Sequence, residues 1–536
     1  MKVVILGGYG VFGERTARLL VRDGHDVVIA GRSMEKAQIL ADDLDATALT
    51  LDRTGDLSLL LTVKPDVVVD AAGPFHSYGD DPYRLAHFAL SHGIHYLDLA
   101  DDADFCIGLA QLDDLAKENG CFALSGLSSV PAVSSAVVQE LSKDMDSIEM
   151  IDTAILPGNR APRGKSVVAG ILSQAGTDIP MMIGGKWQMR RSWSGPVAYD
   201  LSSDMRRKGW LIEVPDLKVF PEVFQARSVF FRAGLELGVM NYGLAAISWM
   251  RSKVMFPVQN WLIVTMLFSA KMLWFLGSDR GGMVVHVTGA TAGTHIRRSW
   301  RLVAEQGEGP FIPAVATRAA LRNPQGIAPG ARVSAAVISL HQIEDAVSDL
   351  AVITTTEETE LQPIFQTVLG PVFRELPPLV QASHQTYGVL RLVGKSTVTR
   401  GTGLISRLLG WVFRFPKADD DISVEVVKIR TQSGETWHRH FGKQTFKSHL
   451  APATNGMTER FGPFTFLLGL QVKGDALVFP VTSAKIFGGI PMPKWLLPIS
   501  VSHETQSEGK FRFDVRLSAP LGIGLVVHYR GYLEPV

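Results

Sequence analysis

Short apolar runs alternate with helical periods along the first 130 residues of the chain. The apolar runs occupy residues 2–8, 26–32, 46–52 and 66–73, and the stretches between them place apolar residues at helical spacing. Tight turns with glycine or aspartate join the two kinds of segment. This alternation is typical of a parallel, doubly wound sheet covered by helices. The pattern therefore predicts an α/β Rossmann domain over residues 1–130.

The next 220 or so residues follow a mixed pattern. Residues 281–290 and 294–306 alternate like the strands of a hairpin, and residues 310–324 and 331–340 resemble small-residue helices that return to cover the first sheet. Polar and proline-rich residues at 354–363 and 374–380 indicate a linker. Single cores stop growing near about 250–300 residues, so several domains are expected. We place the second at residues 131–350 and the third at 365–536.

The third domain is predicted to be β-rich. Residues 386–401, 421–442, 464–489 and 510–535 alternate like strands, carry many aromatic residues and are joined by glycine-rich turns. These features favour an antiparallel barrel or a curved sheet, whose interior either holds a small apolar ligand or is filled by side chains. His438 and His440 flank one arginine without further ligands nearby, so we interpret them as part of a half-exposed strand and predict no metal site.

Residues 254–276 form the most apolar stretch of the protein. No charge lies between Lys253 and Lys271, but Pro257, Gln259 and Asn260 are poorly suited to a membrane-spanning helix. Three interpretations stay open: a buried or interface helix, a peripheral contact with a membrane or lipid, and a true span. An apolar helix that faces solvent would indicate contact with a membrane, a partner or a hydrophobic ligand.

Charge and cysteine usage narrow the function class. The 53 Lys and Arg residues balance the 53 Asp and Glu residues, which argues against nucleic acid as a partner. Cys106 and Cys121 stand outside any Cys-x-x-Cys motif, which argues against a disulfide framework. The apolar run at the start leads into a glycine turn and lacks the features of a signal peptide. We expect a cytoplasmic protein, with membrane association left open.

The first turn carries the motif of a dinucleotide site. Gly7, Gly10 and Gly13 are spaced G-x-x-G-x-x-G between the first apolar run and the first helical period. Glycine is needed where the backbone turns sharply, where it approaches a pyrophosphate, and where the helix packs on the strand. A purely structural turn is the alternative. We assign cofactor binding to the whole turn: Gly7, Gly8, Tyr9, Gly10, Val11, Phe12 and Gly13.

The end of the second strand favours NADP(H) over NAD(H). An NAD site usually has an acidic residue there for the ribose hydroxyls, whereas this chain has Arg32 and Ser33, with Lys36 about one turn later. Those residues suit a 2′-phosphate, unless Arg32 is simply a solvated surface residue. Asp52, after the third strand, either binds the adenine amino group or caps the next helix.

The fourth strand ends in small residues that allow the backbone to pass the ribose and nicotinamide. These residues are Ala71, Ala72, Gly73 and Pro74. Proton donors or acceptors for a reaction at the nicotinamide follow the fourth and fifth strands, namely His76, Tyr96 and Asp98. Asp98 is the first choice among them, although it is equally suited to cap a helix.

The ordered set GGYGVFG, AGR, LTLD, AAGPF, HYLDLADD and GLSSVPAVSS resembles the saccharopine-dehydrogenase-like oxidoreductases over roughly residues 1–350. The resemblance implies an NADP-linked reductase with an inserted α+β domain for substrate binding and dimerisation, and Tyr96 and Asp98 match the family's strand-end tyrosine and acidic residue. Residues after about 360 resemble a domain of unknown function that is fused to this module in some bacterial members.

Two functions remain in competition. The first is an NADP(H)-dependent oxidoreductase that transfers hydride to or from a C=O, C=N or C=C bond of a small hydrophobic substrate, working as a monomer or a homodimer. The second is a non-catalytic lipid-binding or scaffold protein that uses NADP(H) as a structural or redox-sensing ligand. A cofactor site whose nicotinamide end is open to a substrate favours the oxidoreductase. A site whose nicotinamide end is blocked favours the non-catalytic protein.

Overall fold

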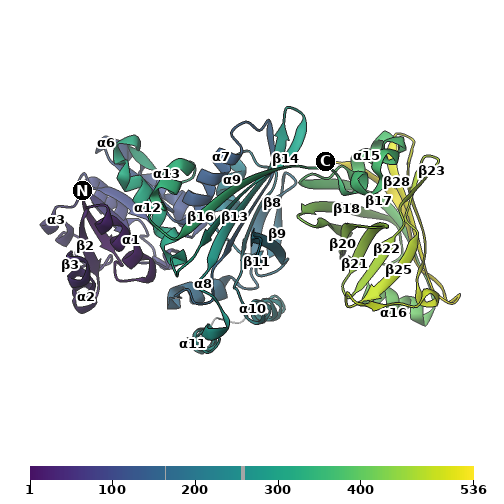
Figure 1. Ribbon diagram of the computed structural model, residues 1–536, viewed down its shortest axis with the longest axis horizontal. Coiled ribbons are helices and arrows are strands. Elements are labelled where there is room, and N and C mark those ends of the chain that lie inside the picture. Colours follow the sequence, from purple (N-terminus) through teal and green to yellow (C-terminus); the bar gives the residue numbers. More distant parts are fainter. Residues whose placement is uncertain (163, 255–256, 258–259) are drawn as a thin grey trace. The chain divides into compact units, whose positions relative to one another are not determined.

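The computed structural model describes residues 1–162, 164–254, 257 and 260–536. The chain forms two compact units, one made of residues 1–292 and 297–359 and the other of residues 293–296 and 360–536 (Figure 1). Each unit is described by itself below.

A parallel sheet forms the start of the first unit, as the alternating pattern predicted. Its strand order is β15-β6-β5-β4-β1-β2-β3, and Val3, Val4 and Ile5 of β1 are fully buried because both faces are covered. The fold class is confirmed as α/β with a Rossmann order of strands. The strands are β1 (Lys2–Leu6), β2 (Asp26–Gly31), β3 (Thr47–Thr50), β4 (Val67–Asp70), β5 (His95–Asp98), β6 (Phe122–Ser125) and β15 (Gly330–Val333).

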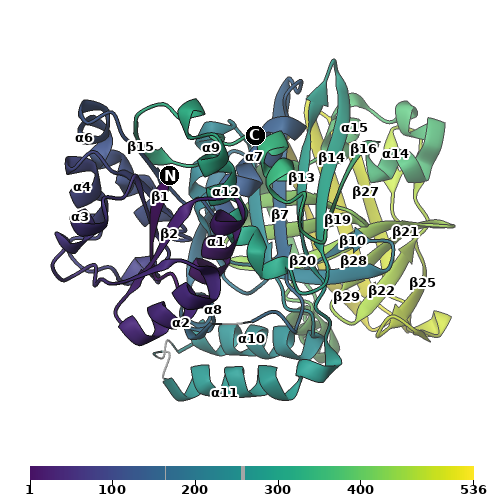
Figure 2. The ribbon, with the colours of Figure 1, turned by 60° about the vertical axis from the view of Figure 1, so that its left-hand side comes forward.

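Helices connect these strands and cover the sheet (Figure 2). They are α1 (Val11–Arg22), α2 (Met34–Leu44), α3 (Leu59–Val63), η1 (Phe75–Ser77), α4 (Arg84–Ser91), α5 (Ala103–Gly108), η2 (Leu109–Leu112), α6 (Asp113–Glu118), η3 (Ser129–Val133) and α7 (Ser134–Leu141). Later in the chain, α12 (Ile312–Arg322) returns to pack on α1, and Arg318 donates to both oxygens of Asp23 at 2.7 and 2.9 Å.

The prediction of a helix at residues 331–340 is wrong. Residues 330–333 form β15, which pairs in parallel with β6, and Ala331 is buried in the sheet. A short apolar run has no period that separates a strand from a helix, so only the pairing partner decides. The helix in this region, α13 (Leu340–Ala346), begins later, at a capping box formed by Ser339 and Gln342.

A second sheet completes the first unit. Its strand order is β10-β11-β12-β7-β13-β14-β16, and the predicted hairpin is confirmed as β13 and β14. The elements of this part are β7 (Ser147–Leu156), α8 (Lys165–Gln174), β8 (Asp178–Ile183), β9 (Lys186–Arg191), β10 (Val197–Ser202), β11 (Met205–Leu211), α9 (Pro215–Val223), β12 (Val229–Ala233), α10 (Gly238–Arg251), α11 (Asn260–Met272), η4 (Trp274–Leu276), β13 (Gly281–Thr291), β14 (Thr294–Ala304), η5 (Gly309–Phe311), η6 (Pro324–Gly326) and β16 (Val352–Glu360).

The polar segment expected to be a linker is instead an ordered strand. Residues 352–360 form β16 beside β14, and α14 (Ile364–Leu369) and η7 (Gly370–Glu375) follow. Most side chains of β16 are exposed, which explains the polar composition, and its threonines have high strand propensity.

Helices α10 and α11 lie outside both sheets of the first unit, at the bottom of Figures 1 and 2. Within the described part of α11 only Ile263 is buried, whereas Trp261, Val264 and Phe268 are 63%, 52% and 61% exposed. The interpretation of this segment as a buried helix is therefore wrong for the described residues. Among those residues no helix is long and apolar enough to cross a membrane. Residues 255, 256, 258 and 259 of the predicted segment lie outside the described residues.

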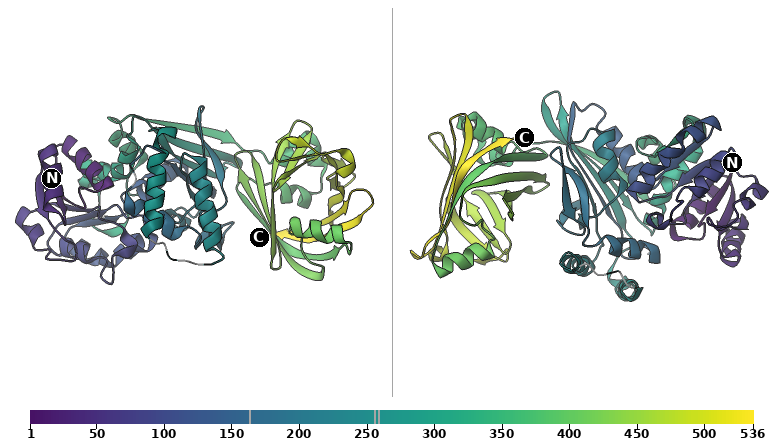
Figure 3. Two further views of the ribbon diagram at one scale, coloured as in Figure 1. Left: turned by 90° about the horizontal axis from the view of Figure 1, so that it is seen from below. Right: turned by 180° about the vertical axis from the view of Figure 1, so that it is seen from behind.

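The second unit is built on one antiparallel sheet of strand order β23-β24-β27-β28-β29-β17-β18-β19-β20-β21-β22-β25-β26 (Figure 3). The strands are β17 (Val389–Arg400), β18 (Asp419–Thr431), β19 (Gly434–Phe441), β20 (Gln444–Ala453), β21 (Gly456–Phe461), β22 (Phe464–Leu468), β23 (Gln471–Lys473), β24 (Ala476–Val478), β25 (Val481–Ile486), β26 (Ile490–Pro491), β27 (Ile499–Ser507), β28 (Lys510–Ala519) and β29 (Gly524–Pro535). The helices of this unit after η7 are α15 (Pro378–His384), α16 (Leu404–Val412) and η8 (Lys494–Leu496). The predicted β-rich domain is confirmed, and its inner side is filled by a core that includes Phe365, Trp437 and Phe441.

Candidate functional site

The glycine turn after β1 fits closely against the end of β4. Gly7 has φ +75, and a Cβ atom there would lie 2.7 Å from Cα of Ala72 and 2.8 Å from the carbonyl oxygen of Ala71. A Cβ on Gly13 would lie 2.2 Å from the carbonyl oxygen of Gly7. Side chains at either position are excluded, because the turn packs tightly against the end of β4 and α1 packs tightly against the turn, as a dinucleotide-binding turn requires.

Helix α1 begins directly behind this turn with its N–H groups uncapped by any side chain. Gly10 is its N-cap, with extended backbone and no side-chain hydrogen bond. The first turn of a helix leaves N–H groups without intrahelical partners, and its dipole favours an anion. The turn and the helix start therefore fit a pyrophosphate; of the other predicted residues here, Val11 and Phe12 are partly exposed and Gly8 is buried.

Tyr9 has a specific place that the sequence did not reveal. A Cβ on Gly31 would lie 2.4 Å from Cε1 of Tyr9, so the ring lies directly against the end of β2. The Tyr9 hydroxyl accepts a hydrogen bond from the Ser33 N–H at 3.1 Å. Tyr9 thus fastens the glycine turn to the loop that carries Arg32.

The residues predicted for the 2′-phosphate lie together after β2. Arg32 and Lys36 are exposed, and Ser33 is the N-cap of α2, where its hydroxyl accepts from the Lys36 N–H at 3.4 Å. Asp52 accepts from the backbone N–H and the hydroxyl of Thr54 at 2.9 and 2.8 Å, and these bonds lower the pKa of Asp52. Arg32 lies near enough to Asp52 to add to that shift.

The small residues after β4 separate an exposed histidine from a buried carboxyl. Ala71, Ala72 and Gly73 are partly exposed and border the glycine turn, and Pro74 leads into η1. His76 of η1 is exposed at this edge of the sheet. Of the three predicted reactive residues, His76 alone faces solvent, because Tyr96 and Asp98 are at most 1% exposed.

Two buried carboxyls stand side by side at the ends of β4 and β5. Asp70 and Asp98 are partners in the parallel register and both are fully buried. One oxygen of Asp98 accepts from the N–H of Ala100 at 2.9 Å, the N–H of Gly126 at 2.8 Å and the hydroxyl of Ser125 at 2.9 Å. Burial raises the pKa of Asp98 to about 7 and that of Asp70 to about 6.

Two tyrosines and one arginine complete this cluster. The Tyr78 hydroxyl donates to Asp70 at 3.0 Å, and the guanidinium of Arg53 lies 3.5 Å from the centre of the Tyr78 ring. Burial, together with the charges of Asp98 and Asp70, raises the pKa of Tyr96 well above its usual value. The sequence analysis missed Asp70 as a site residue, although a carboxylate that ends an apolar strand run is a visible signal.

A third buried carboxyl lies in the second predicted domain, residues 131–350. Asp216 in the first turn of α9 is 1% exposed, and neither of its oxygens has a hydrogen-bond partner among the described residues. Burial raises its pKa to about 7, and Ser134 of α7 lies near enough to oppose that shift. Lys218 of the same helix donates to Asp104 of α5 at 2.7 Å, which fixes α9 to the first domain. The sequence around Asp216 resembles an ordinary helix start, so it gives no sign that this carboxyl is buried.

The loop of residues 157–164, between β7 and α8, is bonded to the segment that follows α11. Asn159 donates through Nδ2 to the carbonyl of Leu273 at 2.8 Å, and its N–H donates to Glu236 at 2.6 Å. The Arg160 guanidinium lies 4.8 Å from the centre of the Trp274 ring. Residue 163 of this loop lies outside the described residues.

The second unit has a buried charged cluster of its own. Glu504 and Nε2 of His384 are 2.5 Å apart, and Lys428 donates to the Ser383 carbonyl at 2.5 Å. Nζ of Lys428 lies 3.8 Å from the centre of the Trp437 ring, and burial lowers the pKa of Lys428 to about 8. Because each of these groups is paired, the cluster is suited to holding α15 against the sheet.

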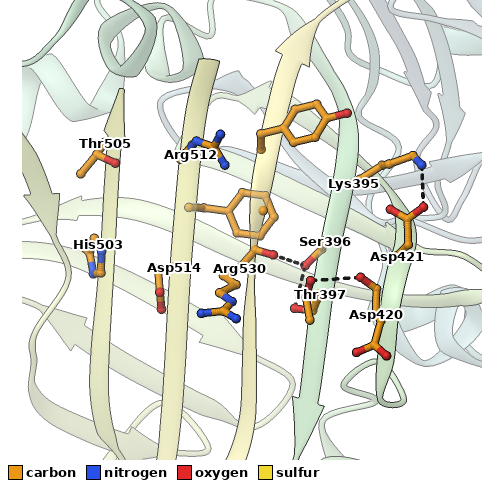
Figure 4. A pocket seen from close by; sticks show the side chains of 13 residues that line it. Lys395, Ser396, Thr397, Asp420, Asp421, His503, Thr505, Arg512, Asp514 and Arg530 are labelled. Carbon is orange, nitrogen blue, oxygen red and sulfur yellow. Dashed lines mark hydrogen bonds and ion pairs between the residues drawn. The ribbon is translucent and has the colours of Figure 1, made fainter. Parts of the chain in front are cut away.

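A polar pocket of about 420 Å³ lies on the opposite face of that sheet (Figure 4). Its walls carry charges of both signs, including Lys395, Asp421 and Arg530, and Lys395 pairs with Asp421 at 2.6 Å. This pocket does not match the small apolar ligand that the sequence left open. His438 and His440 lie on β19 and are half-buried, as predicted.

Comparison with protein families agrees with this geometry. Residues 3–124 match the model of the saccharopine dehydrogenase NADP binding domain, and residues 376–533 match a domain of unknown function, DUF4166. The first match covers the glycine turn, Arg32, Asp70 and Asp98. A comparison with curated protein sequences finds no match to the chain.

Two solved structures resemble the chain only distantly. Apo saccharopine dehydrogenase (L-Glu forming) from Saccharomyces cerevisiae is 14% identical, with 66% of this chain and 99% of that chain covered at a TM-score of 0.47. A myo-inositol dehydrogenase from Corynebacterium glutamicum is 12% identical, with 66% and 98% covered at a TM-score of 0.29. Neither likeness bears on the substrate. From the family matches we conclude that the chain joins an NADP-binding domain of the saccharopine dehydrogenase type, over residues 3–124, to a DUF4166 domain, over residues 376–533.

Proposed function

We propose that the protein is an NADPH-dependent reductase that acts on a C=O, C=N or C=C bond of a hydrophobic substrate. The observation that carries the proposal is the glycine turn, which packs against Ala71 and Ala72 directly after Asp70, the register partner of the buried Asp98. A nucleotide site and proton-holding groups thus meet at one edge of the sheet, which is where ligands bind in such folds.

Hydride transfer to a polar double bond also requires a proton for the atom that gains the electron pair. NADPH supplies the hydride when bound and becomes NADP⁺. Burial raises the pKa of Asp98 to about 7 and that of Asp70 to about 6, so Asp98 is partly protonated at neutral pH. We assign Asp98 as a positioning residue that fixes the loop after β6, since its own side chain is fully buried. His76 is the exposed group that can give the proton to the substrate.

The apolar helices support a lipid-like substrate taken from a membrane surface. Residues 238–277 contain no Asp or Glu, and Tyr242, Trp249 and Trp274 are each more than half exposed. Trp and Tyr favour the boundary between water and lipid. The bonds from Asn159 to Leu273 and from Arg160 to Ser278 join the end of this helical segment to the loop between β7 and α8.

The test is NADPH oxidation with lipophilic carbonyl and enoyl compounds supplied in phospholipid vesicles. We expect turnover with at least one lipophilic acceptor and a large loss in His76→Ala, while the exposed His87→Ala, on α4, keeps the wild-type rate. Binding of NADPH without turnover of any acceptor would count against the proposal.

Full burial of both carboxyls supports a second candidate, a lipid-binding protein that holds NADP(H) without catalysis. In that case the bonds of Asp98 to Ala100, Ser125 and Gly126 serve only to hold the sheet edge together. The same assay separates the two candidates, because the second predicts vesicle binding and NADPH binding without oxidation.

A further inference from the structure

Helix α16 of the second unit turns its apolar stripe toward solvent. Leu404, Leu408 and Trp411 follow one another at helical spacing and are 84%, 58% and 77% exposed. The opposite side of the helix, with Ser406 and Gly410, is buried against the unit. A helix on a solvent-facing surface normally buries its apolar side and exposes its polar side. The exposed apolar face of α16 is therefore expected to bind another molecule.

Other exposed apolar residues lie beside α16. Phe413 follows the helix and packs on Phe464 of β22 at 5.3 Å between ring centres, and Phe464 pairs with Ile486 of β25. The next residue, Phe487, is 80% exposed. Figure 1 shows α16 at the same end of this unit as β22 and β25. We call residues 401–416, 481–498 and 520–524 the apolar end, the last being the turn before β29, on which α16 packs.

The charge of the apolar end has a single sign. Its three segments contain no Asp or Glu. Their exposed basic residues are Arg407, Arg414, Lys485 and Lys494. Exposed Trp411, Phe487 and Trp495 stand among these cations. Bulky aromatic and aliphatic side chains surrounded by basic residues are the composition of a surface that lies in the boundary of an anionic bilayer.

We propose that the apolar end of the second unit binds an anionic lipid bilayer. The apolar side chains enter the boundary between headgroups and acyl chains, and the basic residues contact lipid phosphates. A second copy of the chain is a poorer occupant, because a twofold interface would bring two like-charged surfaces together, each with four basic residues and no carboxylate in its three segments. The proposal rests on residues of the second unit and does not require the reductase activity.

The experiment is flotation of the full-length protein with vesicles of phosphatidylcholine alone and with roughly one third phosphatidylglycerol. The test variant is Leu408→Asp combined with Trp411→Asp. Its matched control is Ile39→Asp, an exposed apolar position on helix α2 of the first unit that is 65% exposed. Circular dichroism and thermal unfolding check that each variant folds. The same pair of substitutions is also made in a background with Phe268→Asp in α11, to remove the contribution of the first unit.

We expect the double variant to reduce binding to the anionic vesicles about tenfold in both backgrounds, with the control unchanged. Arg407→Glu with Lys494→Glu should remove the preference for phosphatidylglycerol. Unchanged flotation of the double variant overturns the proposal. A second outcome also overturns it: the wild type is a dimer, the double variant is a monomer, and vesicle binding is the same for both. The face is then occupied by a second copy of the chain.

Discussion

Asp70 and Asp98 lie opposite each other at the carboxyl ends of neighbouring parallel strands, and neither is exposed to solvent. Parallel strands in register bring such side chains to the same edge, where the glycine turn after β1 also lies. Burial raises the pKa of both carboxyls, and the charge of Asp70 adds to the rise at Asp98. The pair therefore exchanges protons close to neutral pH, and its apparent pKa values belong to both residues.

This pair should make the stability of the first unit depend on pH. The folded pKa of Asp98 is about 7, above the unfolded value of about 3.9. Between these values the native chain binds more protons than the unfolded chain, so its free energy of unfolding falls as pH rises. Asp98→Asn should remove roughly 2–4 kcal/mol of that dependence between about pH 4 and about pH 7. Thermal unfolding across this range measures it.

The matched control for this variant is Asp114→Asn, an exposed carboxyl on α6. The control should keep the pH dependence of the wild type. An Asp98→Asn protein whose stability falls with pH as steeply as that of the wild type would show that Asp98 is ionised throughout the range.

A comparison of Gly7 with Gly24 distinguishes the effect of backbone strain from the effect of a steric clash. Both have left-handed backbones, with φ +75 and φ +78, but a Cβ on Gly7 meets Ala71 and Ala72 below 3 Å, whereas nothing lies within 4 Å of one on Gly24. Alanine at either position costs about 1 kcal/mol of strain. We expect Gly7→Ala to abolish NADPH binding and Gly24→Ala to retain it, as measured by fluorescence of the bound nicotinamide. Equal binding by the two variants would remove the glycine turn from the cofactor site.

Helix α11 should contribute to membrane binding by the first unit. Val264→Asp with Phe268→Asp places two charges on its exposed face, where the side chains are 52% and 61% exposed. We expect weaker flotation with vesicles and a higher KM for a vesicle-borne acceptor, while kcat for a water-soluble acceptor stays the same. A drop in kcat for both acceptors would instead indicate that α11 supports the fold of the site.

The sequence predicted the parts of the fold whose residues carry a strong local period. The strands of the Rossmann sheet and the β13–β14 hairpin are of this kind: β1 and β13 are apolar runs that are buried over most of their length, and turn residues separate them from their neighbours. Strands β15 and β16 were missed because pairing with β6 and β14 defines them, and no local pattern encodes a distant partner. The same reason hid Asp216, whose burial depends on packing between α9 and α7.

The candidate site was predictable to the extent that its residues lie in motifs. The glycine turn and Asp98 stand at strand ends in the sequence, so their meeting at one edge follows from a parallel sheet. The contact of Tyr9 with Gly31, and of Arg53 with Tyr78, joins segments 22 and 25 positions apart, and side-chain packing alone creates it.

Calorimetric titration of NADPH and NADH, with wild-type protein and with Arg32→Ala, tests the cofactor assignment most directly. Arg32 is exposed beside the glycine turn, so its loss should leave the fold intact. We predict that NADPH binds the wild type at about micromolar Kd or better, that NADH binds at least about tenfold more weakly, and that Arg32→Ala removes this difference by weakening NADPH alone. Failure of both nucleotides to bind the wild type would contradict the account and leave the glycine turn with a structural role.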